Sequence, residues 1–215
     1  MSDLWWTMRK AHGYIHQITS TLFTRGTCVH LSRTGPNSSD THTRRETFIS
    51  PAPFPTSTDS PHSSHLKPGG WVELQELRFE PQCDDETMKD DYVIAKFLRL
   101  VKEGLGVLGV DLFGMTKNAQ MLRDAGFVNV EEKVFKIPLG AWPKNKTMKL
   151  IGLYLRSAMY DGLQAVSLGP LVRGLKWTTE EVEVFLISIR KALFDSSVHA
   201  YLPFHIVYGQ KPVEE

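Results

Sequence analysis

The residues best placed for chemistry are two carboxylates on a short strand that follows a tight turn. Pro68-Gly69-Gly70 is typical of a turn, because proline fixes φ and glycine admits positive φ. The apolar residues from Trp71 to Leu77 then indicate a short buried strand, which carries Glu73 and Glu76. Open α/β sheets bind ligands beyond the carboxyl ends of their strands. We therefore predict that Glu73 and Glu76 contact a substrate.

His199 and Tyr201 form a second pair of candidates, at the entrance of the last predicted strand, 201–208. Their position at a strand end gives them the same placement at a ligand crevice. A purely structural interpretation stays open for all four residues. Carboxylates at strand ends are commonly solvated or cap a neighbouring helix, and His199 can simply close a turn.

Other polar clusters do not predict a metal site. Asp84-Asp85-Glu86 is an acidic triplet, but calcium sites use spaced ligands and a glycine turn, so a solvated loop is the favoured interpretation. His62 and His65 have no further ligands at a suitable spacing. Cys28 and Cys83 are far apart in the chain and indicate neither a disulfide framework nor a zinc site.

One glycine pattern formally matches a dinucleotide-binding loop, Gly104-Leu105-Gly106-Val107-Leu108-Gly109. That fingerprint requires a strand before the glycines and a helix after them. Here the preceding residues, 88–108, repeat apolar side chains at helical spacing, so the glycines are predicted to end a helix. We reject the pattern as a nucleotide loop.

These candidates need a scaffold of alternating helices and strands, and the apolar periodicity supplies one. A helix that contains Ala119, Leu122 and Ala125 is predicted between a cap at Thr116 and an end at Gly126, before a strand over 127–137. The remaining predicted helices cover 146–161, 163–174 and 178–193, the last beginning with a Thr178–Glu181 capping box. This order predicts an α/β fold.

Residues 1–65 differ in composition from the rest of the chain. Ser and Thr occupy 21 of these 65 positions, and six of the eight histidines lie there. A helix over about 3–22 is one option, but residues 33–64 have no apolar period and cannot offset the entropy of ordering. We predict a mostly disordered segment 1–65 and a folded domain over 66–212.

Charge and hydropathy exclude several functional classes. A net charge of +1 and an isoelectric point near 7.8 give no bulk attraction to nucleic acid or anionic membranes. The N-terminus lacks a secretory signal, and no apolar run reaches the roughly 18 residues of a membrane helix. The sequence therefore predicts an intracellular protein, cytoplasmic or nuclear, with no nucleic-acid or membrane partner.

An ordered set of motifs in the folded part closely resembles the C-terminal half of fungal S-adenosylmethionine-dependent methyltransferases of class I. The similar group includes nuclear regulators of secondary metabolism. The resemblance covers about residues 66 to 212. The motifs that carry it are Leu66-Lys67-Pro68-Gly69-Gly70-Trp71-Val72-Glu73-Leu74-Gln75-Glu76, Ala125-Gly126-Phe127-Val128-Asn129-Val130, Gly140-Ala141-Trp142-Pro143-Lys144-Asn145-Lys146, Ser197-Val198-His199-Ala200-Tyr201 and Val207-Tyr208-Gly209-Gln210-Lys211-Pro212.

The resemblance implies a Rossmann-like, seven-stranded methyltransferase sheet of which only the last three strands are present. Residues 66–77 would supply strand five, 127–137 strand six, and 201–210 the antiparallel strand seven. The helices between strands six and seven would form a cap over the substrate pocket. On this view Glu73, Glu76, His199 and Tyr201 lie on the side of an unknown methyl acceptor.

The family's cofactor-binding motifs are the missing part. In such enzymes S-adenosylmethionine is held mainly by the first half, yet residues 1–65 contain no Gly-x-Gly pattern. They are also too few for four strands with crossovers, since each βαβ unit needs about 30 residues. We therefore expect a truncated methyltransferase without cofactor-binding residues. The alternative is a non-catalytic fragment or interaction module that binds a protein partner, or itself, through an exposed sheet edge.

Overall fold

The computed structural model describes two compact units. It covers residues 27–32, 46–50, 66–110 and 117–213. The helical unit contains residues 77–110 and 136–203, and the sheet unit contains 27–32, 46–50, 66–76, 117–135 and 204–213. The predicted helix over 3–22 lies outside the described residues, as does most of the segment predicted to be disordered. Among the described residues, no helix has the length and apolar character needed to cross a membrane.

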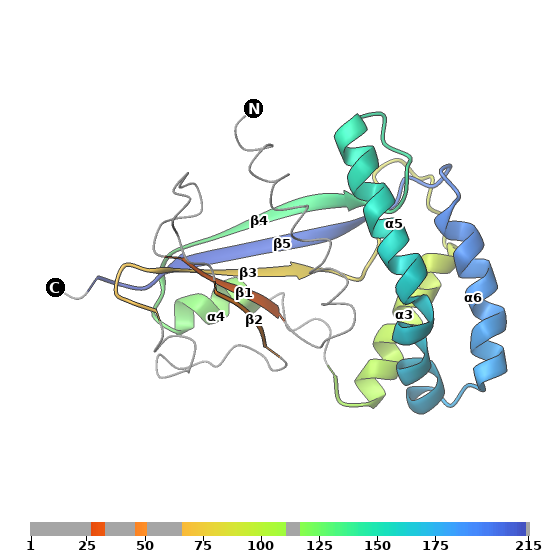
Figure 1. Ribbon diagram of the computed structural model, residues 1–215, viewed down its shortest axis with the longest axis horizontal. Helices are drawn as coiled ribbons and strands as arrows, with labels where there is room; N and C mark the ends of the chain where they lie inside the picture. Colours follow the sequence, from red (N-terminus) through yellow and green to blue (C-terminus); the bar gives the residue numbers. More distant parts are fainter. Residues whose placement is uncertain (1–26, 33–45, 51–65, 111–116, 214–215) are drawn as a thin grey trace. The chain divides into compact units, whose positions relative to one another are not determined.

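A five-stranded sheet with strand order β2-β1-β3-β5-β4 is the frame of the sheet unit. Its strands are β1 Thr27–Ser32, β2 Glu46–Ser50, β3 Trp71–Leu77, β4 Val128–Pro138 and β5 Tyr201–Gln210. β1 pairs antiparallel with β2 and with β3. Figure 1 shows β3 and β4 running in one direction and β5 in the opposite direction. The predicted α/β class and the predicted strands at β3, β4 and β5 are therefore confirmed.

The turn before β3 is fixed by the last residues of β5 and those that follow. Gly69 has φ +76°, the left-handed conformation that glycine adopts without strain, and its N–H donates to the Lys211 carbonyl at 3.0 Å. The Lys211 N–H donates to the Gly70 carbonyl at 2.8 Å, and the Lys211 ammonium donates to the Leu66 carbonyl at 2.9 Å. The turn predicted from Pro68-Gly69-Gly70 is present, and it aligns β3 beside β5.

Helix α4 (Asn118–Asp124) covers an apolar cluster on the sheet. Gly126, with φ +80°, ends it in a Schellman motif, in which the Phe127 N–H bonds the Leu122 carbonyl and the Gly126 N–H bonds the Arg123 carbonyl. Leu122 is fully buried. The cluster consists of Leu66, Val72, Leu74, Leu122, Ala125, Phe127 and Val207. The core of the sheet unit is thus built from large side chains of both strands and helix.

The helical unit has fewer separate helices than the sequence predicts. Figure 1 shows its long helices α3 (Val93–Val107), α5 (Lys146–Ser167) and α6 (Thr179–Leu193) packed together. The predicted break between 161 and 163 is wrong, because α5 continues through buried Gly162 into a π-helical segment, η2 (Leu168–Gly174). α3 also begins later than the predicted residue 88. The Thr178–Glu181 capping box of α6 is confirmed.

The rejected glycine pattern has a packing role in the helical unit. Gly104 lies inside α3, and a Cβ placed on it would be 2.2 Å from the carbonyl oxygen of Pro170 in η2. A Cβ on Gly174 would be 2.4 Å from the Gly104 carbonyl oxygen. The two backbones therefore touch directly. Because no strand precedes Gly104, the context of a nucleotide-binding loop is absent, as the periodicity predicts.

Candidate functional site

Three loops of the helical unit meet at the first residues of β5. The loop after β3 is joined there by a pair of backbone hydrogen bonds of 2.9 Å between Gln82 and Tyr201. The loop after β4 is joined by the Leu139 N–H, which donates to the Ala200 carbonyl at 2.9 Å. The loop that follows α6 ends in His199. Since β3 and β4 share a direction (Figure 1), the first two loops leave from carboxyl ends of strands, where α/β sheets bind ligands.

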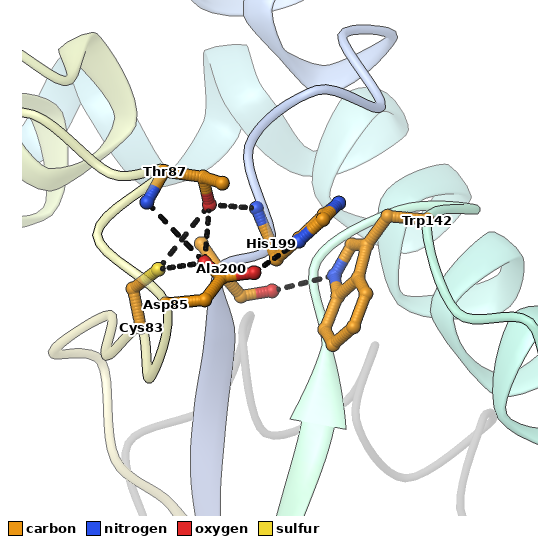
Figure 2. A network of polar contacts seen from close by, with 6 residues as sticks. All are labelled: Cys83, Asp85, Thr87, Trp142, His199 and Ala200. Carbon is orange, nitrogen blue, oxygen red and sulfur yellow. Dashed lines mark hydrogen bonds and ion pairs between the residues drawn. The ribbon is translucent and has the colours of Figure 1, made fainter.

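His199 is held at this point by Asp85, 114 residues earlier in the chain. Its Nδ1 bonds a carboxylate oxygen of Asp85, and its backbone N–H donates to the Thr87 hydroxyl at 2.8 Å. Asp85 is fixed in turn by the Thr87 N–H at 3.2 Å, the Thr87 hydroxyl at 2.8 Å and the Cys83 thiol at 3.1 Å. Figure 2 shows the resulting network. Main chain and side chain of His199 are therefore both positioned by one loop.

Trp142 fixes the plane of the His199 ring. The indole stacks on the imidazole with ring centroids 5.0 Å apart and planes inclined by 29°. The indole Nε1–H donates to the Ala200 carbonyl at 2.9 Å, so the same residue is anchored to the start of β5. Figure 2 shows the imidazole between Asp85 and Trp142, with its second ring nitrogen pointing away from Asp85. The stack on Trp142 and the bond to Asp85 therefore both constrain the orientation of the imidazole.

The network keeps Asp85 ionised. Its hydrogen bond with His199, followed by those from Thr87 and Cys83, holds the pKa of the Asp85 carboxyl well below its ordinary value. The side chains of His199 and Asp85 are 38% and 47% exposed, so solvent reaches both. The pair is accessible to a ligand and is not part of a sealed core.

Tyr201 has its hydroxyl group engaged elsewhere. The hydroxyl donates to Asp84 at 2.9 Å, and the Lys136 ammonium lies 4.8 Å from the ring centroid and 2.5 Å from Asp84. Burial, and then the bond with Asp84, raises the pKa of Tyr201. Lys136 lowers the pKa of Asp84. Tyr201 thus belongs to a closed Tyr–Asp–Lys group that ties the loop after β3 to the end of β4.

Glu73 and Glu76 lie in the sheet unit, on β3, whereas His199 and Tyr201 lie in the helical unit. Glu73 is buried and accepts a hydrogen bond from the Gln75 amide. Glu76 accepts a hydrogen bond from the Asn118 amide at 3.4 Å. The structure thus places His199 and Tyr201 together in the helical unit. Glu73 and Glu76 instead have hydrogen-bond partners within the sheet unit.

Asp85, Thr87 and Trp142 are the site residues that the sequence interpretation missed. The sequence predicts a solvated loop at Asp85, and it indicates Trp142 only as part of a family motif. Within the described part of the chain, no group of three His, Cys, Asp or Glu side chains could hold a metal ion. His62 and His65 lie outside the described residues. The acidic triplet was a usable signal, but nothing local in sequence pairs it with His199.

Comparison with known proteins identifies fungal relatives. No protein-family model and no solved structure matches the chain. The chain is 30% identical to the probable methyltransferase tdiE of Emericella nidulans, over 82% of this chain and 59% of tdiE. It is 30% identical to the secondary metabolism regulator LAE1 of Cochliobolus heterostrophus, over 69% of this chain and 49% of LAE1. It is 25% identical to the protein-methionine methyltransferase laeA of Emericella nidulans, over 70% of this chain and 40% of laeA.

The predicted resemblance to fungal methyltransferases of the secondary-metabolism-regulator group is therefore confirmed. The chain spans about half the length of the curated relatives it matches. An alignment over 82% of this chain is longer than the stretch from Leu66 to the last residue, so the match with tdiE also includes residues before Leu66.

Proposed function

From this similarity to fungal methyltransferases and regulators of secondary metabolism, we propose that the chain carries the acceptor side of an S-adenosylmethionine-dependent methyltransferase. The observation that carries the proposal is the match, over most of the chain, to relatives named as methyltransferases. The His199 network adds a positioned polar group at the edge where α/β sheets bind ligands.

The strand arrangement supports an assignment within the methyltransferase sheet. We assign β3, β4 and β5 to strands five, six and seven, because β5 lies between β3 and β4 and runs opposite to both (Figure 1). The helices α5, η2 and α6 between β4 and β5 would then be the cap over the acceptor. β1 does not extend a parallel sheet, since it pairs antiparallel with β3.

The described residues 104–109 do not fit an S-adenosylmethionine site. Their glycine pattern at 104–109 starts inside α3, where Gly104 has no space for even a Cβ because the Pro170 backbone fills it. A phosphate- or nucleoside-binding turn needs open backbone N–H groups at the start of a helix. We therefore assign no cofactor role to any described residue, and the proposal concerns the acceptor side alone.

A binding module without catalysis is the second candidate function. It is favoured by the half-length match to the relatives and by the position of β4 at one edge of the described sheet. β4 also carries exposed apolar side chains, Val128 and Val134, at 45% and 54% exposure. An edge strand of this kind can pair with a strand of a partner or of a second copy. This candidate predicts dimers, or a partner that pairs with β4, and no binding of S-adenosylmethionine.

Calorimetric titration of the purified 215-residue chain with S-adenosylmethionine and S-adenosylhomocysteine separates the two candidates. Micromolar binding of both compounds is the result expected of a methyltransferase and would require cofactor contacts outside the described residues. No binding by a folded chain would favour the module. An Asp85→Asn variant is the matched control: it should keep any cofactor affinity, because Asp85 is assigned to the acceptor side. Light scattering after size-exclusion chromatography reports self-association in the same samples.

A further inference from the structure

We propose that Asp85 holds His199 with its proton on Nδ1, so that His199 Nε2 accepts the proton of a hydroxyl-bearing methyl acceptor. This inference rests on the proposed function and adds the chemical class of the acceptor. His199 would touch the acceptor, and Asp85 would be a positioning residue.

The first step concerns the tautomer. An ionised carboxylate has no proton to donate, so Nδ1 of His199 must be the donor in its bond with Asp85. In a neutral imidazole the other nitrogen, Nε2, is then the acceptor. Asp85 accepts hydrogen bonds from Thr87 and Cys83 on its other oxygen, Oδ1, which leaves Oδ2 for His199. The direction of every bond in the network therefore agrees with one tautomer.

The second step concerns direction and access. The stack on Trp142 and the bond to Asp85 together fix the ring, and Figure 2 shows Nε2 pointing out of the network. The His199 side chain is 38% exposed. A general base must lie within hydrogen-bond reach of the proton it accepts, and an oriented nitrogen on a partly exposed ring meets that condition.

The third step concerns the acceptor. When a hydroxyl proton moves to Nε2, the O–H bond breaks and an N–H bond forms. The positive charge of the resulting imidazolium is balanced by the negative charge of Asp85. A phenol is the best-matched hydroxyl, because its pKa of roughly 10 lies within reach of an imidazole base. A thioether acceptor has no proton to lose, so an oriented base would have no task there. The geometry thus favours a phenolic acceptor over a thioether acceptor.

A second histidine–carboxylate pair provides an internal control. His205 Nδ1 lies 2.7 Å from Glu132. The His199 pair differs in that its carboxylate, Asp85, also accepts from Thr87 and Cys83 and its imidazole stacks on an indole. Both rings can be observed in the same protein by nitrogen NMR, in which neutral tautomers have distinct ring ¹⁵N shifts.

The NMR test uses the full chain and the variants Asp85→Asn and Glu132→Gln. In wild type, neutral His199 should be in the Nδ1–H form. Asp85→Asn should move His199 to the Nε2–H form, because the asparagine amide can donate to Nδ1, and Glu132→Gln should leave His199 unchanged. A wild-type His199 in the Nε2–H form would overturn the proposal, as would a tautomer that does not respond to Asp85→Asn.

The acceptor class is tested with 4-nitrophenol, whose phenolate absorbs in the visible range. At a pH where the free probe is mostly protonated, binding to wild type should raise its phenolate band, and His199→Gln should abolish the rise. The assignment would be wrong if the probe bound without forming phenolate, or if the phenolate band persisted in His199→Gln. Absence of binding would exclude phenols as the acceptor class. Neither measurement uses S-adenosylmethionine, so failure here is distinct from failure of cofactor binding in the titration.

Discussion

Both units have buried apolar side chains, but the helical unit also depends on a close contact between two backbones. In the sheet unit, large apolar side chains such as Leu74, Leu122 and Phe127 fill a common core. In the helical unit, the contact between α3 and η2 depends on missing side chains at Gly104 and Gly174. Side-chain packing tolerates substitutions of similar volume, whereas direct backbone contact tolerates none. The two units should therefore respond differently to small changes.

The histidine–carboxylate pairs show the same contrast. In the sheet unit, His205 and Glu132 join the neighbouring strands β5 and β4. In the helical unit, His199 and Asp85 join loops that are 114 residues apart, with Thr87 and Trp142 as further anchors. A histidine–carboxylate pair on adjacent strands adds little positional constraint, because the backbone hydrogen bonds between the strands already fix where the two residues lie. A pair between loops determines the position of both, and that makes the His199 pair the better candidate for function.

The largest expected effect is in the sheet unit. Leu122→Ala removes a fully buried side chain and should reduce the free energy of unfolding by about 2–5 kcal/mol. Hydrogen exchange read by mass spectrometry should show lost protection in residues 66–76 and 118–135. Val128→Thr, at a 45% exposed position on the same unit, is the control and should change little. Equal loss of protection in α3, α5 and α6 would show that the two units unfold together.

Next in size is the backbone contact of the helical unit. Gly104→Ala places a methyl group against the Pro170 carbonyl and should destabilise the chain by about 1–3 kcal/mol, measured by denaturant unfolding. Gly106→Ala is the matched control two residues away in the same helix, where no atom lies within 4 Å of the new Cβ. Alanine is favoured over glycine in helices by roughly 0.5–1 kcal/mol, so this variant should be slightly more stable. Similar results for both variants would contradict the close contact.

A smaller effect is expected at the start of α6. The Thr178 hydroxyl accepts from the Glu181 N–H at 3.1 Å, while the Glu181 carboxylate accepts from the Thr178 N–H at 2.8 Å. Thr178→Ala should cost about 1 kcal/mol in thermal or denaturant unfolding, and Thr178→Ser should restore most of it. Loss of protection confined to the first turn of α6 would show that the cap acts locally.

The smallest expected effect is the pH response of Asp85. Because its pKa in the folded chain is lowered, mainly by His199, ionised Asp85 stabilises the folded state above the ordinary carboxyl range. This contribution is lost as the pH falls below roughly 4, toward the folded-state pKa. The thermal midpoint of Asp85→Asn should therefore fall less than that of wild type on acidification. Parallel curves would show that the exposed pair contributes nothing to stability, as some surface pairs do.

The sequence determined the features that depend on neighbouring residues. The turn at Pro68-Gly69-Gly70, the helix end at Gly126 and the capping box at Thr178 all occur as predicted. Each is decided by the conformational range of one residue or by a hydrogen bond across three residues. The motifs from Leu66 onward also indicated the relatives that comparison then found.

Tertiary structure alone decided the features that depend on distant residues. α5 passes through Gly162 because packing offsets the roughly 1 kcal/mol that glycine costs in a helix. Trp142 meets Ala200 and Asp85 meets His199 across 58 and 114 residues, since the loops after β3 and β4 converge on the start of β5. No local sequence pattern predicts such contacts between distant residues. They follow from the order of strands in the sheet, which brings together side chains whose sequence contexts are unrelated.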